Sequence, residues 1–178
     1  MNTFLPFKSF TRSAKVLDSK RLGKQRVEVF QILRVLRGET IGWRNHPAVK
    51  MWRGHEQALG MYGAAMCDEW TNHGYVDATK TKILTLSGYT PGTTAIAPWW
   101  LGAPDFHLAQ QSNLLRKKRD HYEQFFPFVP DDLPYWWPDE ETWKQDPRLL
   151  TIRKRMIELG LSEIDGDFIQ MTGHPASR

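Results

Sequence analysis

The residues best suited to chemistry lie in one short stretch, residues 17–31, with the sequence LDSKRLGKQRVEVFQ. It places one carboxylate, Glu28, among several cations. A helix would bring Arg21, Gln25 and Glu28 onto one stripe, because residues three and four apart are neighbours on a helix. Such cations can bind an anion, and the carboxylate can stabilise positive charge or take up a proton. The alternative is a solvated helix face.

A second polar group occupies residues 43–56, with the sequence WRNHPAVKMWRGHE. Pro47 suits the first turn of a helix, which would place His46 at the helix start, where backbone N–H groups bind phosphate. Arg44 and Arg53 add positive charge. A histidine at such a position is more often structural than catalytic.

A third group lies in residues 105–126. His107, Gln111, Lys118 and His121 would fall broadly on one side of a helix there. The cations of this segment also fit a solvated helix end, which the helix dipole favours. The group is therefore compatible with a binding surface and with an ordinary exposed face.

Other site chemistries find no support in the sequence. The single cysteine, Cys67, excludes an internal disulfide and a cysteine-based zinc site, and a buried structural thiol is expected. The residues after His55 and Glu56 do not complete an H-E-x-x-H metal motif. No phosphate-binding loop, G-x-S-x-G or dinucleotide fingerprint is present. We expect no metal and no cofactor.

Charge is unevenly distributed along the 178 residues, whose net charge is +4. Residues 1–55 hold twelve Lys and Arg against three acids, whereas residues 127–147 hold six acids and one Lys. A basic half favours an anionic partner, and nucleic acid is the commonest one. A solvated basic surface balanced by an acidic tail is the alternative.

The elements that position these residues are mostly helices. The 3.6-residue period and the Pro and Gly boundaries predict the helices and connecting segments. Helices are expected from Ser13 or Asp18 to Arg37, from Pro47 to about Trp70, from Pro104 or Asp105 to about residue 126 with Asp105 as its cap, and over about residues 148–159. An arm or short strand is expected at residues 3–7, an ordered loop or short strand at 76–104, and a short irregular tail after Gly160.

The predicted fold class is mostly α, a single compact helical domain with long ordered loops. An aromatic, proline-rich stretch should wrap the domain near its C-terminal end. We expect a helical domain over residues 1–147, with residues 148–178 forming a helix and tail packed on it. The start, MNTFLPFKSF, does not resemble a signal peptide, and no apolar stretch approaches the length of a membrane span. A cytoplasmic monomer with no membrane partner is expected.

Three stretches in this order resemble the pyrimidine-dimer DNA glycosylase family, which includes phage endonuclease V. They are DSKRLGKQRVE, NHPAVKMWRGHEQALGMYGAAMCDEWTNHGY and PDFHLAQQSNLLRKKRDHYEQFF, the last followed by an aromatic stretch. The resemblance covers about residues 3–137. It lies in the order of the three stretches along the chain and in the types of residue that they contain.

The resemblance implies a compact helical enzyme that acts on double-stranded DNA and flips a base from the helix. In the family an N-terminal amine attacks the sugar C1′ and forms a Schiff base, and β-elimination then nicks the strand. Carried over, Glu28 is the catalytic carboxylate. The implied DNA contacts are Arg21, Lys24, Gln25, Arg26, Arg44, Asn45, His46, Arg53 and Lys118.

Two departures from the family pattern leave alternatives open. The family's nucleophile is a Thr exposed by loss of the initiator Met, whereas here Asn2 follows Met1 and Thr3 comes next. The amine could belong to Met1, Asn2 or Thr3, or the lyase step could be absent. The family's Arg and Glu are adjacent, whereas Val27 separates the two here. A non-enzymatic nucleic-acid or nucleotide binder, or a glycosylase for another modified base, would fit the same residues.

Overall fold

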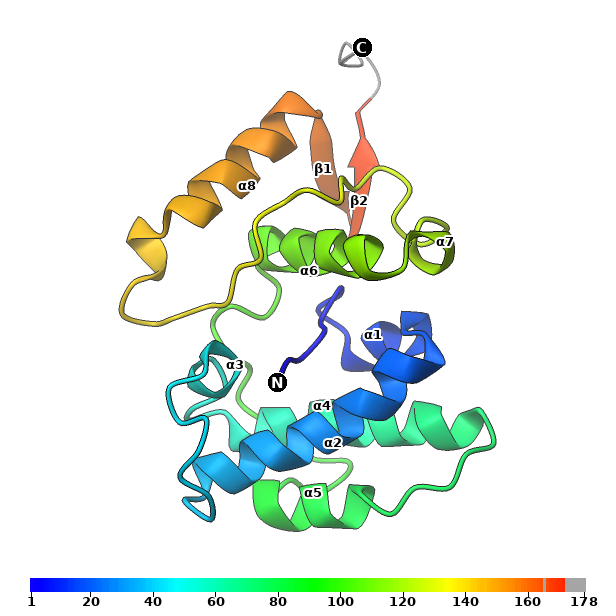
Figure 1. Ribbon diagram of the computed structural model, residues 1–178, viewed down its shortest axis with the longest axis vertical. Coiled ribbons are helices and arrows are strands. Elements are labelled where there is room, and N and C mark those ends of the chain that lie inside the picture. The colour runs from blue at the N-terminus through cyan, green and yellow to red at the C-terminus, as the bar shows by residue number, and fades with distance from the viewer. Residues whose placement is uncertain (165, 172–178) are drawn as a thin grey trace. The chain divides into compact units, whose positions relative to one another are not determined.

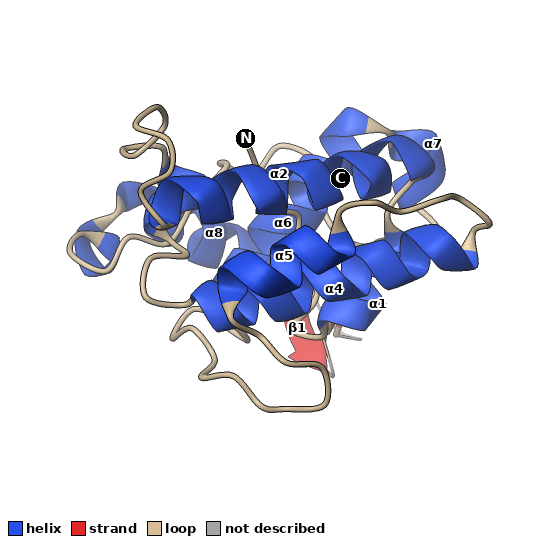
Figure 2. Cartoon of the chain, turned by 90° about the horizontal axis from the view of Figure 1, so that it is seen from below, coloured by secondary structure: helices blue, strands red, loops and turns tan. Residues whose placement is uncertain are grey.

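The computed structural model describes residues 1–164 and 166–171, and these are mostly helical, as the sequence predicts (Figure 1, Figure 2). The chain divides into two compact units. The first contains residues 1–4 and 9–99, and the second contains residues 5–8 and those from 100 onward. Each unit is described on its own below.

The first unit is built from five helices among its described residues. They are α1 (Phe10–Val16), α2 (Ser19–Leu36), α3 (Pro47–Lys50), α4 (Glu56–Asn72) and α5 (Lys80–Ser87). Helix α2 begins where the sequence predicts, because the Asp18 side chain caps it by accepting from the backbone N–H of Arg21 at 3.1 Å. It ends at Leu36, before Gly38, whose φ is 77°.

The sequence predicts one helix from Pro47 to Trp70, but the structure has two helices there, α3 and α4, so the prediction of a single continuous helix is wrong. Residues 51–55 are not helical, and Gly54 has a φ of 79°, which interrupts a right-handed helix. Pro47 does open α3, as predicted, and His46 caps it. Cys67 on α4 is fully buried, and burial raises the pKa of its thiol to about 12.

Helix α5 lies in the segment that the sequence predicts to be a loop, and that prediction is wrong. The carboxylate of Asp77 accepts from the backbone N–H groups of Thr79 and Lys80 at 3.0 and 2.7 Å and so supports the first turn. Ile83 of α5 is fully buried. Gly88, with a φ of 68°, ends the helix.

Close packing of α4 against α2 fixes the orientation of α2. A Cβ atom added to Gly63 would come within 2.7 Å of Val29 Cγ1 and 2.9 Å of Ile83 Cγ2. The missing side chain therefore lets α4 approach both α2 and α5. This contact holds the face of α2 that carries Glu28 in one place.

The second unit contains three α-helices, a 3₁₀ helix and a two-stranded sheet among its described residues. They are α6 (Pro104–Lys117), α7 (Arg119–Tyr122), η1 (Trp143–Gln145), α8 (Pro147–Glu158), β1 (Leu161–Ile164) and β2 (Asp167–Gln170). The third predicted helix is interrupted at Lys118, whose φ of −161° and ψ of 77° are not helical. Ala103, not Asp105, is the cap of α6, and Asp105 forms an ion pair with Arg153 at 2.7 Å.

The antiparallel pairing of β1 and β2 contradicts the expectation of an irregular tail over residues 161–170. Leu161 pairs with Gln170, and Ile164 pairs with Asp167. Leu161 and Phe168 are both buried, and the register places them on the same side of the sheet. The predicted tail at 172–178 lies outside the described residues.

Helix α6 holds the arm of residues 5–8 through buried polar side chains. The Nδ1–H of His107 donates to the Leu5 carbonyl at 2.8 Å, and its Nε2 accepts from the Gly102 N–H at 2.9 Å. Burial lowers the pKa of His107 to about 4, so the ring is neutral at pH 7. Gln111 Nε2 donates to the Pro6 carbonyl at 2.9 Å.

None of the helices in the described part of the chain combines the length and the apolar character that a membrane crossing requires.

Candidate active site

Glu28 of α2 is a buried carboxylate whose partners are all nitrogen groups. Its residue is 4% exposed. The α-amino nitrogen of Met1 lies 3.7 Å from Oε1, and Lys24 Nζ lies 3.4 Å from the same oxygen. Oε2 accepts from the backbone N–H of Asn2 and from Gln25 Nε2, each at 3.1 Å. A buried carboxylate is expensive unless it is paired in this way.

The N-terminal arm reaches Glu28 because buried side chains hold it against α2. Gln25 Oε1 accepts from the Phe4 N–H at 3.0 Å and from the Tyr62 hydroxyl at 2.7 Å. The same hydroxyl lies 2.9 Å from the Phe4 carbonyl. Thr3 is fully buried, and its Oγ1 accepts from Trp52 Nε1 at 3.0 Å. The arm is therefore fixed at residues 3 and 4, and the two residues before them extend to the carboxylate.

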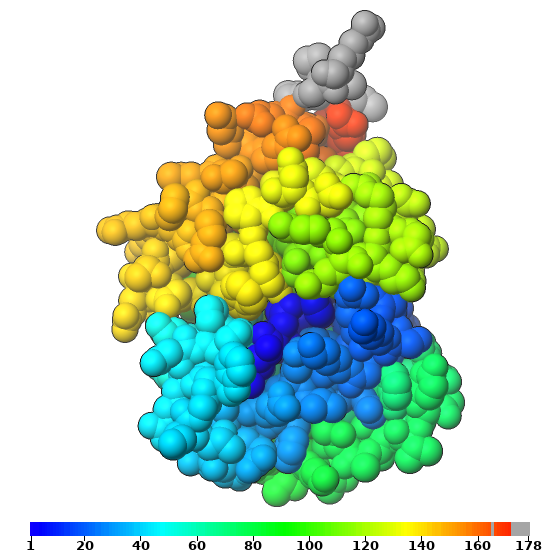
Figure 3. Space-filling view, in the orientation of Figure 1, coloured from blue at the N-terminus to red at the C-terminus, as the bar shows by residue number. Residues whose placement is uncertain are grey.

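The first residues of the chain reach the protein surface near this carboxylate. The space-filling view shows their dark blue atoms beside the cyan segment that follows α2 (Figure 3). The Met1 side chain is nevertheless only 5% exposed. Asn2 Oδ1 is also buried and has no hydrogen-bond partner among the described residues. The site thus offers an amine, a carboxylate and one unused acceptor.

His46 lies within electrostatic reach of both the amine and the carboxylate. Its Nδ1 accepts from the Ala48 N–H at 3.1 Å, which fixes the ring at the start of α3. Burial lowers the pKa of His46, and the positive charge of the N-terminus lowers it further, while Glu28 acts in the opposite direction. The imidazole is therefore neutral at pH 7.

Two of the predicted phosphate contacts are occupied by carboxylates. The guanidinium of Arg21 pairs with Asp18, and that of Arg26 pairs with Asp77. Their side chains are 17% and 11% exposed. Arg26 also lies 4.3 Å from the ring centroid of Trp70. Both arginines hold α2 in the fold, and neither presents an unpaired charge on the surface.

Of the other predicted DNA contacts, five residues are exposed, four in the first unit and one in the second, whereas Gln25 is fully buried and His46 is partly buried. Lys24, Arg44, Asn45 and Arg53 are exposed in the first unit, where Arg53 Nη2 donates to the Arg44 carbonyl at 3.3 Å. Lys118 is exposed in the second unit. The structure thus brings Glu28, Asn2, Gln25, Lys24 and His46 to one place. Among the described residues, no group of His, Cys, Asp and Glu could hold a metal ion.

Sequence reasoning missed two participants in this site. Tyr62, on α4, supports Gln25, and an isolated tyrosine in a helix gives no sequence signal of such a role. Trp43 lies edge-on to His46, with ring centroids 5.5 Å apart, and its φ of 66° is unusual for a large side chain. Its position one residue before Arg44 in a Gly-rich turn is the signal that could have identified it.

The arrangement can support attack by an amine on an electrophilic carbon. A carboxylate beside an ammonium group can accept its proton and so release the lone pair. The same buried charge stabilises a cation that develops within reach of it. A neutral imidazole close by adds no competing positive charge.

Comparison with known proteins supports a specific family. Residues 1–83 match the family model described as pyrimidine dimer DNA glycosylase. The matched range contains Glu28, the N-terminal arm, His46 and Trp43, and it does not contain Lys118. Comparisons with curated proteins and with solved structures gave no significant match.

Proposed function

We propose that this protein, whose residues 1–83 belong to the pyrimidine dimer DNA glycosylase family, breaks the N-glycosidic bond of a damaged pyrimidine in double-stranded DNA. We further propose that its N-terminal amine is the nucleophile and that the same site nicks the strand. The observation that supports this most strongly is the 3.7 Å separation between the Met1 α-amino nitrogen and Glu28 Oε1.

In the first step the neutral amine attacks C1′ of the deoxyribose with its lone pair. The new C1′–N bond forms as the bond from C1′ to the base breaks, and the base leaves with those electrons and takes up a proton. Positive charge builds on the sugar in this transition state. Glu28 is held in place before the reaction, so it stabilises that charge without reorganisation.

In the second step Glu28 accepts a proton from the attached nitrogen. The lone pair of this nitrogen then expels O4′ from C1′ to give a protonated imine, and O4′ takes up a proton and becomes the 4′-hydroxyl. Loss of a proton from C2′ then moves electrons toward C3′, and the 3′ phosphate leaves. Water hydrolyses the imine and returns the free amine. No co-reactant other than water is needed.

The position of the arm narrows the choice of nucleophile. Thr3 is fully buried, and its hydroxyl accepts from Trp52, so its nitrogen lies within the fixed part of the arm. Met1 carries the amine in the structure. Loss of Met1 would leave the nitrogen of Asn2, which is 3.1 Å from Oε2, at the same carboxylate. A chain that begins at Met1 and one that begins at Asn2 would therefore both place the terminal amine beside Glu28, as the proposal requires.

Phosphate binding is assigned to cations that are exposed in the first unit. Lys24 has a side chain that is 66% exposed, and Arg44 and Arg53 are exposed on the segment around α3. Phosphate contacts from such side chains supply affinity and fix the register of the DNA without reading its sequence.

The test is reduction with borohydride during incubation with DNA that contains an abasic aldehyde. An imine is reducible, so we expect a covalent protein–DNA adduct, and peptide mapping should locate it at the first residue. Intact mass gives the identity of that residue. A duplex with tetrahydrofuran at the abasic position lacks the aldehyde and should give no adduct.

Lys24→Ala is the matched control, because Lys24 is the other amine near Glu28. This variant should still form the adduct, whereas a chain extended by a few residues before Met1 should not. An adduct on Lys24, or none with any abasic substrate, would remove the N-terminal amine from the mechanism.

A further inference from the structure

The side-chain oxygen of Asn2 is a polar atom of the site that neither step of the proposed mechanism uses. This Oδ1 atom is shielded from solvent, and it has no hydrogen-bond partner among the described residues. An amide oxygen carries no proton, so it acts only as an acceptor. A buried polar atom without a partner costs free energy, and a catalytic role is one reason for a fold to keep it.

The place of Asn2 in the chain keeps this oxygen beside the terminal amine. The backbone N–H of Asn2 donates to Glu28 Oε2 at 3.1 Å, and the α-amino nitrogen of Met1 lies 3.7 Å from Glu28 Oε1. The two nitrogens therefore lie at the two oxygens of one carboxylate. Since consecutive Cα atoms are about 3.8 Å apart and the asparagine side chain is short, Oδ1 remains close to the amine and to any bond that the amine forms.

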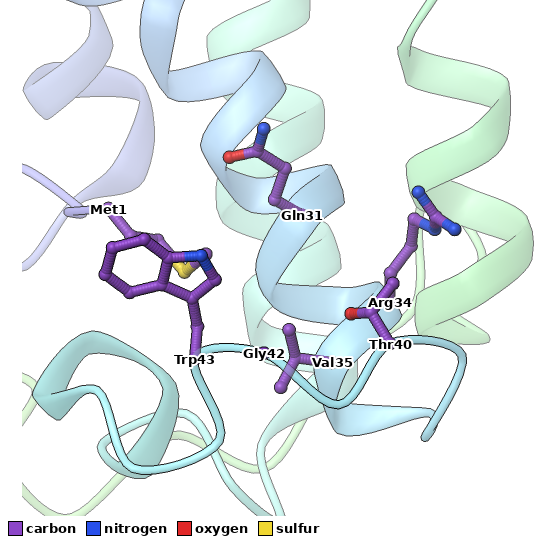
Figure 4. A pocket seen from close by; sticks show the side chains of 7 residues that line it. All are labelled: Met1, Gln31, Arg34, Val35, Thr40, Gly42 and Trp43. Atoms are coloured by element: carbon purple, nitrogen blue, oxygen red, sulfur yellow. The ribbon is translucent and has the colours of Figure 1, made fainter.

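The terminus also has an open side. A cavity of about 380 Å³ adjoins Met1 in the first unit. Figure 4 shows the Met1 side chain beside the indole of Trp43, with Gln31 of α2 across from them. The site therefore combines room for a substrate at the terminus with a buried acceptor that solvent does not reach.

The proposed reaction forms a hydrogen-bond donor at this place. After the attack on C1′, the terminal nitrogen carries two hydrogens and a positive charge. Glu28 accepts one of these protons, and the protonated imine keeps the other. That N–H has to stay on the nitrogen during the nicking step, because the protonated imine is the form that draws electrons from the C2′–H bond. A neutral amide oxygen binds such an N–H without removing its proton, and a hydrogen bond from a charged donor is among the stronger ones.

We infer that Asn2 is a catalytic residue of the strand-nicking step, in which its Oδ1 accepts a hydrogen bond from the N–H of the protonated imine at the terminal nitrogen. This bond holds the imine in its protonated form and fixes the plane of the C=N bond. Glu28 serves the proton transfers, and Asn2 binds the proton that must not be transferred. The inference rests on the proposed function, and it concerns only the step that follows imine formation.

The electrons of this step balance without a further reactant. Glu28 is a carboxylate again once its proton has passed to O4′, and it then accepts the proton of C2′. The C2′–H electron pair forms the C1′=C2′ bond, and the C=N pair becomes a lone pair on the nitrogen. That lone pair re-forms C=N, the C1′=C2′ pair moves to C2′=C3′, and the C3′–O pair leaves with the phosphate. The N–H beside Asn2 is unchanged throughout.

The test measures imine formation and nicking separately in the wild type and in Asn2→Leu, which removes the oxygen with little change in size. The substrate is a duplex with an abasic aldehyde, under single-turnover conditions. Borohydride adducts on the uncut strand report the imine, and loss of the full-length strand reports nicking. Adduct formation by Asn2→Leu should stay within about 3-fold of the wild type, because Glu28 still accepts the first proton. Nicking should be slower by about 10- to 150-fold, the effect of one hydrogen bond to a charged group, so uncut adduct should accumulate.

Stability separates this role from a structural one. Asn2 Oδ1 has no hydrogen-bond partner in the described part of the fold, so Asn2→Leu should require the same or a higher denaturant concentration to unfold. Asn72→Leu is the matched control, because Asn72 is an exposed amide of the first unit whose Nδ2 donates to Glu69 Oε2 at 3.4 Å. This variant should keep both wild-type rates. Intact mass checks that all three proteins begin at the same residue.

A wild-type nicking rate in Asn2→Leu would overturn the inference and leave the proposed function standing. Equal slowing of adduct formation and nicking would also overturn it, because Asn2 would then only position the amine. A wild-type protein that forms no adduct would remove the amine chemistry itself, and this inference with it. That last result is seen without any variant, so failure of the proposed function and failure of the role of Asn2 are distinguishable.

Discussion

The backbone nitrogen of Asn2 donates a hydrogen bond of 3.1 Å to Oε2 of Glu28, although the two residues are 26 positions apart in the sequence. The same carboxylate lies 3.7 Å from the α-amino nitrogen of Met1. A terminus is ordinarily the most mobile part of a chain, and here it is tied to a buried charge. This contact gives the terminal amine one defined position, which is a requirement for a nucleophile.

Glu28→Gln should retain DNA binding and lose bond cleavage. The variant keeps the shape of the side chain but removes the charge that stabilises the cationic sugar in the transition state, so turnover should fall by about 100- to 10,000-fold. Removing this buried negative charge, which lies beside the exposed cation Lys24, should leave affinity for DNA equal or higher. Strand cleavage and binding measured on the same preparation give both values.

Glu39→Gln is the control for Glu28→Gln. Glu39 is another glutamate of the first unit, but it is 43% exposed and pairs with Arg34 at the surface. Its removal should change neither cleavage nor binding by more than about 2-fold. Full turnover in Glu28→Gln would show that the buried carboxylate only anchors the arm.

Gln25→Leu should reduce cleavage through the position of Glu28 and the arm. Gln25 is fully buried and joins the Phe4 N–H, the Tyr62 hydroxyl and Glu28 Oε2. Leucine has a similar size but leaves buried polar groups without partners, which should lower the free energy of unfolding by about 1–3 kcal/mol. Denaturant unfolding measures this loss.

A positioning role for Gln25 can be separated from lost stability by kinetics. Single-turnover cleavage by Gln25→Leu should be slow even at temperatures where the variant is fully folded, whereas Gln57→Leu, at an exposed position, should behave as the wild type. Wild-type cleavage by a folded but destabilised Gln25→Leu would limit Gln25 to a structural role.

Local signals in the sequence predict α2 well, but the contacts around it depend on distant residues. The Asp18 cap and the glycine after Arg37 mark its ends, and both act within a few residues. Arg26 looks like a free cation because its partner, Asp77, is 51 positions away. The carboxylate of Asp77 also supports α5, so one distant residue accounts both for the missed helix and for the ion pair of Arg26 that the sequence did not predict.

Local sequence signals also failed to predict the break between α3 and α4 and the two short strands, β1 and β2. A single glycine is compatible with a helix, and only its φ of 79° shows that Gly54 ends one. The strands β1 and β2 are four residues each, too short for a clear alternation. The place of Glu28 beside the terminus likewise depends on the arm, whose path is set by Tyr62 and Trp52.

Arg44→Ala combined with Arg53→Ala should weaken DNA binding and reduce its salt dependence, because both changes remove phosphate contacts. Each phosphate contact contributes about 0.9 to the slope of log K against log salt on duplex DNA, so two lost contacts should flatten the slope by roughly two units. Both residues are exposed on the segment around α3. Binding measured at several salt concentrations gives the slope.

Arg26→Ala is the contrasting variant. Arg26 is paired with Asp77 and is mostly buried, so its removal should leave the salt slope unchanged. It should instead lower the free energy of unfolding by about 3 kcal/mol, because an unpaired buried carboxylate remains. A flattened slope in Arg26→Ala, with an unchanged slope in the Arg44→Ala, Arg53→Ala double variant, would show that the phosphate contacts lie on α2 and not around α3.

The stability of the protein should fall in acid because of His107. Burial lowers the pKa of this imidazole to about 4 in the folded state, against about 6.5 in an unfolded chain. The unfolded state therefore binds a proton first as the pH falls below 6.5, and folding loses free energy from there down to pH 4. The full loss is about 3 kcal/mol, since one unit of pKa corresponds to about 1.4 kcal/mol.

Denaturant unfolding between pH 7.5 and 4 in the wild type and in His107→Gln isolates this contribution. Other groups titrate in both proteins, so the difference between their free energies of unfolding is the relevant quantity. The wild-type advantage should be largest above pH 6.5 and should shrink toward pH 4. His107 holds the Leu5 carbonyl, so a constant difference across this range would mean that the pKa of His107 is the same in the folded and unfolded states and that the imidazole acts only as a structural hydrogen-bond donor.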